Sequence, residues 1–154
     1  MESPANAPHA DGMSIVLCGV DDTEAGTTVM TAAKAAAERS GAPLVLTHVA
    51  TSHWGANVPA FHADGGATQR VVEHGPPAQR ILAIADGNDA ELIVLGTRAK
   101  RFNSVAKHVV KRARCPVMIV GPAADPEAEP VTRLGFDRGL LRSSKTPVVV
   151  VPRG

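Results

Sequence analysis

Residues 14–49 read SIVLCGVDDTEAGTTVMTAAKAAAERSGAPLVLTHV, and this stretch decides the fold class. Residues 14–20 and 44–49 are short, continuous apolar runs, which are typical of strands buried on both faces of a sheet. Between them the apolar residues recur at helical spacing until Gly41, which ends the helix. Strand, helix and strand within about 35 residues predict a βαβ unit with a right-handed crossover.

The alternation continues toward the C-terminus. Strands are predicted at 69–73, 92–95 and 117–120, with one helix from Pro76 to Gly87 and another that begins at Asn103 or Ser104. Such alternation predicts a doubly wound α/β fold with a mostly parallel sheet and helices on both faces. Ligands of open sheets bind beyond the carboxyl ends of the strands, where the strand order reverses. The expected binding edge is therefore Asp21–Thr23 together with Gly96–Ser104.

Composition narrows the function classes. The chain has 154 residues, 44% of them hydrophobic, which suits a single domain with one core. The net charge of +1 and the scarcity of aromatic residues argue against nucleic acid as a partner, and no apolar run is long enough to cross a membrane. Residues 1–12 lack the features of a secretory signal and are expected to be a flexible lead, so we expect a cytoplasmic protein. Cys18 and Cys115 are expected to be buried and unpaired.

Two stretches depart from the alternation. Residues 50–68 have no helical period and predict a long loop, with Trp54 and Phe61 as its anchors on the sheet. Residues 135–152 (GFDRGLLRSSKTPVVVVP) repeat residues 104–121 (SVAKHVVKRARCPVMIVG) at an offset of 31, after a linker at 122–134. This repeat of one helix and one strand, and of nothing else, predicts an extra strand at 148–151 beside 117–120. The strand at 148–151 pairs with residues 117–120 either of the same chain or, by exchange, of a second chain. The stiff Pro-rich linker favours exchange.

Six short motifs occur in an order that resembles the universal stress protein family. They span about residues 13–120 and begin near the predicted strand ends and helix starts. They are Val20-Asp21-Asp22-Thr23, His48-Val49, Gly75-Pro76-Pro77-Ala78, Glu91-Leu92-Ile93-Val94-Leu95-Gly96-Thr97-Arg98, Asn103-Ser104-Val105-Ala106 and Cys115-Pro116-Val117-Met118-Ile119-Val120.

The resemblance implies a five-stranded sheet of order 3-2-1-4-5 over residues 13–121 and a homodimer formed through the last strands. It also implies that one branch of the family binds ATP through a loop of the form G-x2-G-x9-G-(S/T). Here Gly96 matches the first glycine, but Ala99 replaces the second, and only three residues separate Ala99 from Asn103. A loop with fewer glycines and fewer backbone N–H donors is a poorer phosphate cradle. The helix that separates the second and third strands in the family is also replaced here by the long loop.

The candidate nucleotide-binding residues follow from these matches. Asp21 matches the family aspartate near the adenosine, and it is equally suited to cap the first helix. Arg98, Lys100 and Arg101 form either an anion site or a solvated surface, whereas Lys107, Lys111, Arg112 and Arg114 suit an exposed helix face. The start of the helix at 103–104 can attract an anion. The full set is Asp21, Val49, Gly96, Arg98, Asn103 and Ser104.

No catalytic or metal-binding motif is present. The chain has no nucleophile elbow, Walker loop or zinc-protease motif, and burial of Cys115 argues against a reactive thiol. His48, His53, His62 and Asp64 have no spacing typical of a metal site.

The sequence therefore predicts a non-enzymatic stress-response protein that acts through dimerisation and partner binding, with weak or absent ATP binding. The alternative is a regulatory domain that binds ATP, AMP or another adenine nucleotide through the shortened loop. A nucleotidyl transferase of the wider nucleotide-binding α/β class ranks third. An anionic small molecule remains a candidate ligand.

Overall fold

The computed structural model describes residues 14–20, 25–50, 68–96, 100–134 and 143–152. Within them the strands form one seven-stranded sheet of order β3-β2-β1-β4-β5-β7-β6. The strands are β1 (Ile15–Val20), β2 (Leu44–Ala50), β3 (Thr68–His74), β4 (Ala90–Gly96), β5 (Val117–Val120), β6 (Val131–Leu134) and β7 (Val148–Val151), and the helices are α1 (Ala25–Ser40), α2 (Pro77–Gly87) and α3 (Lys100–Arg112). The doubly wound α/β class and the order of the first five strands are as predicted.

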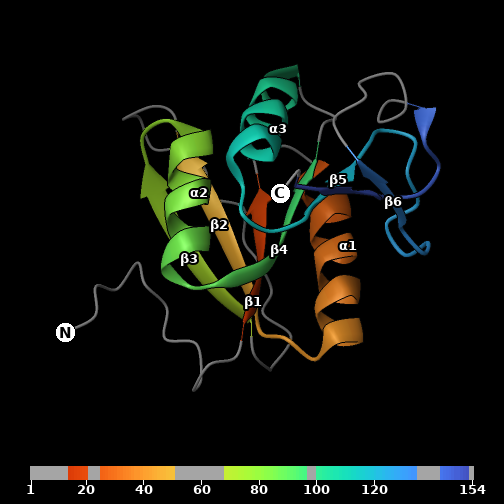
Figure 1. Cartoon of the computed structure of the whole chain (residues 1–154), viewed down its shortest axis with the longest axis horizontal. Coiled ribbons are helices and arrows are strands. Elements are labelled where there is room, and N and C mark those ends of the chain that lie inside the picture. The colour runs from red at the N-terminus through yellow and green to blue at the C-terminus, as the bar shows by residue number, and fades with distance from the viewer. Residues whose placement is uncertain (1–13, 21–24, 51–67, 97–99, 135–142, 153–154) are drawn as a thin grey trace.

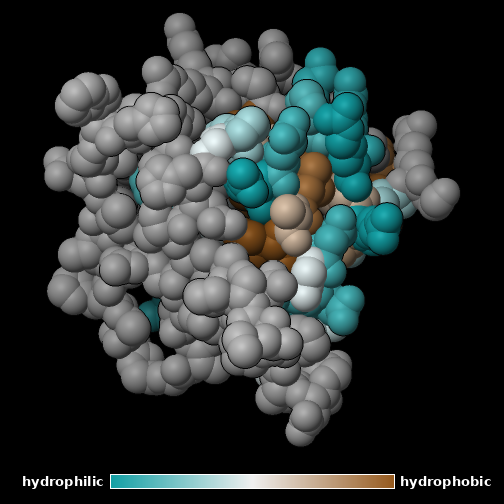
Figure 2. All heavy atoms as spheres, turned by 90° about the vertical axis from the view of Figure 1, so that its left-hand side faces the viewer, coloured by the Kyte–Doolittle hydropathy of each residue, from teal (hydrophilic) through white to brown (hydrophobic). Residues whose placement is uncertain are grey.

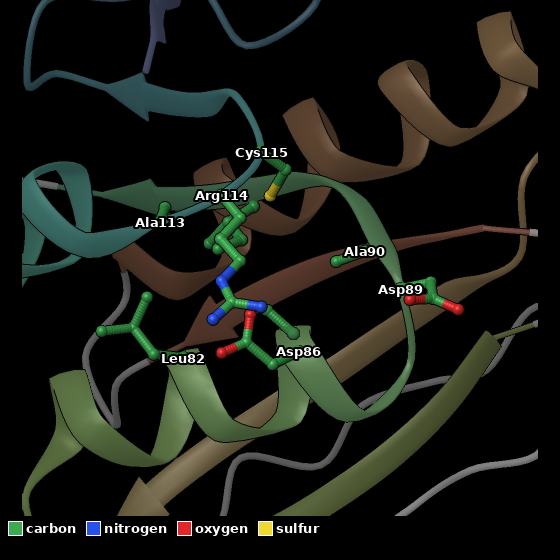
Figure 3. Close-up of a pocket in the computed structure, with 9 residues that line it drawn as sticks. Leu82, Asp86, Asp89, Ala90, Ala113, Arg114 and Cys115 are labelled. Carbon is green, nitrogen blue, oxygen red and sulfur yellow. The ribbon is translucent and has the colours of Figure 1, made fainter. Parts of the chain in front are cut away.

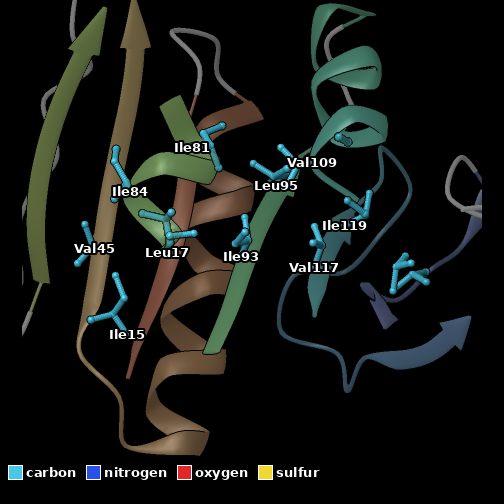
Figure 4. Packing of buried hydrophobic residues seen from close by; sticks show 14 residues of the cluster. Ile15, Leu17, Val45, Ile81, Ile84, Ile93, Leu95, Val109, Val117 and Ile119 are labelled. Atoms are coloured by element: carbon cyan, nitrogen blue, oxygen red, sulfur yellow. The ribbon is translucent and has the colours of Figure 1, made fainter. Parts of the chain in front are cut away.

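Helices cover both faces of the sheet (Figure 1). On one face α1 packs through Val29 and four alanines, all at the helical spacing that the sequence shows. On the other face α2 and α3 lie over a second cluster, in which Figure 4 shows Leu17, Ile81, Ile93 and Val109 pointing together. Successive residues of β1 enter opposite clusters, because side chains alternate along a strand. This double burial explains why β1 has a continuous apolar run.

Gly96 ends β4 at a point where a helix crosses close to the strand. A Cβ atom on Gly96 would lie 2.4 Å from Cγ2 of Val29 in α1, a distance at which one of the two must shift. Close packing against Val29 therefore explains why residue 96 is a glycine, without any role in phosphate binding. Gly41, which follows α1 with φ of +71°, has the left-handed conformation expected of a residue that ends a helix.

The structure corrects the predicted start of α3. The helix begins at Lys100, so Asn103 and Ser104 lie inside it rather than at its cap. Residues 100–103 are polar or aromatic without a helical period, and Asn103 is a good capping type, so no sequence pattern indicates the extra turn. The amide of Ser104 is thereby committed to the helix, and the free N–H groups belong to residues nearer to Lys100.

The C-terminal region contains more than the sequence predicted. β7 pairs antiparallel with β5 of the same chain, beside 117–120 as expected. However, the stretch expected to be a linker contains β6, which pairs parallel with β7 and forms the edge of the sheet. The linker also turns back through hydrogen bonds, among them the Asp125 N–H to the Lys145 carbonyl at 2.9 Å. In the structure β7 docks on β5 of the same chain, and exchange between two chains stays a prediction.

Several predictions fall outside the described residues. They concern the lead at 1–12, the loop with Trp54 and Phe61, and most of the helical part of the repeat.

Candidate functional site

The candidate site is the carboxyl edge of the sheet between β1 and β4, where the strand order reverses. β1 lies between β2 and β4 and runs parallel to both, with Val20 opposite His48 and Cys18 opposite Val94. The strand ends of β1, β2 and β4 therefore meet at one edge. Doubly wound folds bind their ligands at such a reversal.

The fold brings some of the sequence-predicted site residues to this edge. Val49 lies in β2, one residue beyond His48, and Gly96 is the last residue of β4. Asn103 and Ser104 lie one turn into α3, which follows β4. Asp21 and Arg98 lie outside the described residues, and they follow β1 and β4 directly in the sequence. The assignment of these six residues to a nucleotide site stays a prediction.

The connection between β4 and α3 is short. β4 ends at Gly96 and α3 begins at Lys100, so the connection consists of residues 97, 98 and 99. Three residues bring few backbone N–H groups to the site beyond those of the first helical turn. Three residues are too few to form an extended phosphate-binding loop between β4 and α3.

A cavity of about 250 Å³ lies next to this edge, at the carboxyl end of β5. Thr28 contributes a hydroxyl group, and none of the described residues that line the cavity carries a charge. Such a lining offers apolar contact and few polar partners, which does not suit a phosphate group. The lining residues are Thr28, Val29, Val120, Gly121, Pro122, Ala124 and Pro126.

Two buried polar side chains at the end of β2 lack hydrogen-bond partners in the part of the chain that the structure describes. They are Thr47, whose hydroxyl is unpartnered, and His48, whose two ring nitrogens are both unpartnered. His48 is only 2% exposed and lies opposite Val20 of β1 and Val72 of β3. Buried polar groups almost always have a hydrogen-bond partner. Both ring nitrogens of His48 are therefore available for a hydrogen bond to a group at the candidate edge. In the sequence His48 belongs to the His48-Val49 motif and to a set of histidines without metal-site spacing, and neither pattern indicates a buried ring without a partner.

A second cavity, of about 130 Å³, lies at the opposite edge of the sheet, by the amino ends of β4 and β5. Figure 3 shows the Arg114 guanidinium and the Asp86 carboxylate pointing toward one another across it, with Cys115 close by. Burial, and to a lesser degree the charge of Asp86, raises the pKa of Cys115 to about 11. Its thiol is therefore protonated near neutral pH, which agrees with the expectation that it is not a reactive nucleophile.

The remaining surface features are ordinary. Figure 2 shows hydrophilic side chains around a small hydrophobic area on the face beside α2 and β3. Lys107, Lys111, Arg112 and Arg114 are exposed, as expected of a solvated helix face. Both cysteines are free, and burial raises the pKa of Cys18 above its ordinary range. Among the described residues there is no cluster of potential metal ligands and no helix that could span a membrane.

Part of the chain is similar to known proteins. Residues 55–121 match the model of the universal stress protein family. A universal stress protein of Methanocaldococcus jannaschii is 42% identical over 52 residues, which cover 30% of this chain and 31% of that relative's length.

Solved structures agree in fold. A universal stress protein in complex with cAMP has a TM-score of 0.55 at 17% identity, over 71% of this chain and 98% of the other. A universal stress protein from Archaeoglobus fulgidus in complex with dAMP has a TM-score of 0.52 at 24% identity, over 70% and 96%. Residues 55–121 are therefore similar to the universal stress protein family, and the chain shares the fold of solved universal stress proteins.

Proposed function

We propose that this protein is a non-enzymatic stress-response protein that acts through contacts with other protein chains and binds ATP weakly or not at all. The observation that carries the proposal is the three-residue connection between β4 and α3. The ATP-binding branch of the family has a much longer glycine-containing loop at the equivalent point. A triphosphate needs many donors, and the first turn of one helix offers only a few.

Two further observations support weak binding of a triphosphate. None of the described residues that line the neighbouring cavity carries a charge, so these residues provide no counter-charge for phosphate groups. In addition, Gly96, which matches the first glycine of the ATP loop, is explained by the close approach of Val29.

The absence of enzymatic activity is supported by the chemistry of the described cavities. The thiol at the amino edge is protonated, because burial raises the pKa of Cys115 to about 11. The cavity beside the candidate edge presents one hydroxyl, from Thr28, with no basic side chain among the described lining residues to activate it.

Calorimetric titration tests the proposal, with ATP, ADP and AMP added to protein that has been freed of nucleotide by denaturation and refolding. We expect no ATP dissociation constant tighter than about 10 μM, which corresponds to roughly −7 kcal/mol. A tighter constant for ATP would overturn the proposal and favour the nucleotide-binding alternative.

A second candidate function is the binding of AMP-type nucleotides at the same edge. The specific observation in its favour is the imidazole of His48, which is buried at the carboxyl end of β2 and has no hydrogen-bond partner among the described residues. Structures of the same fold are complexes with cAMP and dAMP, each of which has a single phosphate. One phosphate group needs fewer N–H donors than three phosphate groups do, so the short connection between β4 and α3 disfavours AMP-type nucleotides less than it disfavours ATP.

The two candidates are separated by titrating AMP and cAMP into the unaltered chain and into His48→Phe, which keeps the ring but removes both nitrogens. If AMP-type nucleotides bind at this edge, His48→Phe weakens binding by about tenfold, the typical effect of one hydrogen bond to a charged or polar group. His108→Phe is the matched control, because His108 is exposed on α3. Equal affinities in all three proteins would place any bound nucleotide elsewhere.

A further inference from the structure

The cavity at the amino edge of the sheet has an apolar floor and two opposite charges at its mouth. Ile93 and Ala85 are 0% and 5% exposed and belong to the core cluster beneath α2 and α3. Asp86 and Arg114 are exposed, and Figure 3 shows their charged groups pointing toward one another across the cavity. Three half-buried residues complete the apolar floor, namely Leu82, Ala90 and Ala113.

The end of α2 holds the acidic side of this cavity in place. Asn88, which ends the helix, is 1% exposed and donates twice to the carbonyl of Ile84, from its backbone N–H at 3.1 Å and from Nδ2 at 2.8 Å. Asp86 lies in the helical turn that this cap closes. None of the residues in that last turn, all of which the structure describes, is basic. The Asp86 carboxylate and the negative end of the helix dipole therefore act together to attract a cation.

Arg114 brings the opposite charge from the other wall of the cavity. It follows α3, at a point where the N–H of Ala113 still donates to the carbonyl of Val109 at 2.8 Å. The guanidinium therefore extends from an ordered part of the backbone. Its N–H groups lie in a fixed plane and can bind a carboxylate through two parallel hydrogen bonds. This wall suits an organic carboxylate.

Pairing of Asp86 with Arg114 leaves part of the cavity unused. Ion pairs that are exposed to solvent contribute little to stability, and this one would leave the apolar floor beneath it in contact with water. A ligand that brings an ammonium group to Asp86, a carboxylate to Arg114 and an apolar group to the floor would satisfy all three. In an α-amino acid these three groups leave the same carbon atom.

We propose that the cavity at the amino edge binds a free α-amino acid with a small aliphatic side chain, such as valine. Its charged groups pair with Asp86 and Arg114 at the mouth, and its side chain covers Ile93 and the other apolar residues of the floor. The site lies at the edge opposite to the candidate nucleotide site, so the proposal does not rest on the nucleotide affinity.

The size and charges of the cavity disfavour other ligands. Its volume of about 130 Å³ is well below the roughly 300–1,000 Å³ of pockets that enclose larger organic ligands, so a nucleotide does not fit inside. A phosphate beside Arg114 would be repelled by the carboxylate of Asp86, and a simple amine beside Asp86 would be repelled by the guanidinium. A small zwitterion avoids both repulsions.

The first test compares three ligands that share one carbon skeleton. L-valine, isovalerate, which lacks the ammonium group, and isobutylamine, which lacks the carboxylate, are titrated into the ¹⁵N-labelled full chain. The amide signals of Ala85 and Ala113 are expected to shift saturably with L-valine, with a dissociation constant on the order of 1 mM for so small a ligand. The other two compounds are expected to bind at least about tenfold more weakly. Isovalerate or isobutylamine that binds as tightly as L-valine, or the absence of a saturable shift with L-valine, would overturn the proposal.

The second test removes each charge in turn. Asp86→Asn and Arg114→Gln are expected to weaken L-valine binding by about tenfold each, the usual effect of losing one hydrogen bond to a charged group. Both residues are exposed, so both variants should remain folded, which thermal denaturation checks. Asp125→Asn and Arg112→Gln are the matched controls, because these exposed residues do not line the cavity, and they should bind L-valine normally. Unchanged affinity in folded Asp86→Asn and Arg114→Gln would contradict the proposal.

The thiol of Cys115 provides an independent readout, because it lines the same cavity. Cys18 is 0% exposed, so alkylation of the folded chain by iodoacetamide reports on Cys115. At ten times its dissociation constant, L-valine should slow this alkylation by about tenfold, as expected when the occupied cavity does not react. Isobutylamine at the same concentration should have little effect. Alkylation that is equally fast with and without bound L-valine would show that the amino acid binds elsewhere and would overturn the assignment to this cavity.

Discussion

The last four strands of the sheet form two parallel pairs, β4–β5 and β6–β7, which differ in burial. Their registers correspond, because Ile93 lies opposite Val117 and Val131 lies opposite Val148. Residues 93–96 of β4 are all buried, whereas all four residues of β6 are exposed. The sequences follow this difference, since Ile93, Val94 and Leu95 stand where β6 has Val131, Thr132 and Arg133. β6 thus repeats the strand pairing of β4 but not its burial in the core.

The difference shows what an edge strand requires. A central strand such as β4 is covered on both faces and has neighbours on both sides. A free edge that is long and apolar invites pairing with other chains. β6 is short and has Arg133 and Thr132 at its centre, features that limit further pairing. The C-terminal unit, which consists of β6 and β7, therefore covers the edge of β5 and leaves a short, exposed and more polar strand at the edge of the sheet.

The largest expected difference between the two pairs is at Ile93 and its equivalent, Val131. Ile93 is 0% exposed and Val131 is 37% exposed. Ile93→Ala should lower the free energy of unfolding by about 2–5 kcal/mol, the cost of a cavity in a closed core. Val131→Ala should cost less than about 1 kcal/mol, as surface substitutions do. Urea unfolding measures both, and equal costs would show that β6 is as tightly packed as β4.

The next comparison tests whether β7 belongs to the core. Val150 is equivalent to Ile119, and both lie in the same cluster. Val150→Ala should destabilise the whole domain by about 2 kcal/mol, the loss of two buried carbon groups and the cavity that they leave. Chemical unfolding followed by circular dichroism should remain a single transition. A separate early transition that alone responds to Val150→Ala would mean that the C-terminal unit folds apart from the domain.

A smaller effect is expected at Gly96, whose equivalent in β6 is Leu134. A methyl group at Gly96 would collide with the stiff, β-branched side chain of Val29, so Gly96→Ala should cost about 1–3 kcal/mol. Leu134 is 71% exposed, and Leu134→Ala should change stability by no more than about 0.5 kcal/mol. Thermal denaturation of the two variants provides the measurement. A neutral Gly96→Ala would show that α1 moves away from β4 without cost.

The smallest effect concerns pH. The repeat has Thr146 where the first copy has Cys115, whose pKa is raised by burial from 9.0 to about 11. A raised pKa means that the folded state favours the protonated thiol. This contribution to stability is fully present below pH 9 and is lost as the pH rises toward 11. Cys115→Thr should therefore lose less stability than the unaltered chain across this interval. Identical pH profiles would indicate that the thiol is open to water.

The sequence predicts β5 and β7 well because each is a four-residue apolar run after a proline. β5 is buried throughout, whereas β7 is buried at Val148 and Val150 and half-buried at Val149 and Val151. β6 could not be predicted, since VTRL has no apolar run or alternation and its pairing comes only from docking of β7. The start of α3 was missed because its first turn lacks an apolar face, and Asn103 resembled a cap. The sequence locates the edge that holds the candidate site, because the predicted strand ends lie there. It does not show that the ring nitrogens of His48 lack partners among the described residues, because that depends on the burial of the ring in the fold.

Sedimentation of the unaltered full chain over a range of protein concentrations tests the central claim most directly. If β7 holds the β5 edge within the chain, the mass stays near 15.9 kDa at micromolar concentrations. A stable dimer under the same conditions would contradict the account, because it would show either that β7 leaves β5 or that two chains join through another surface.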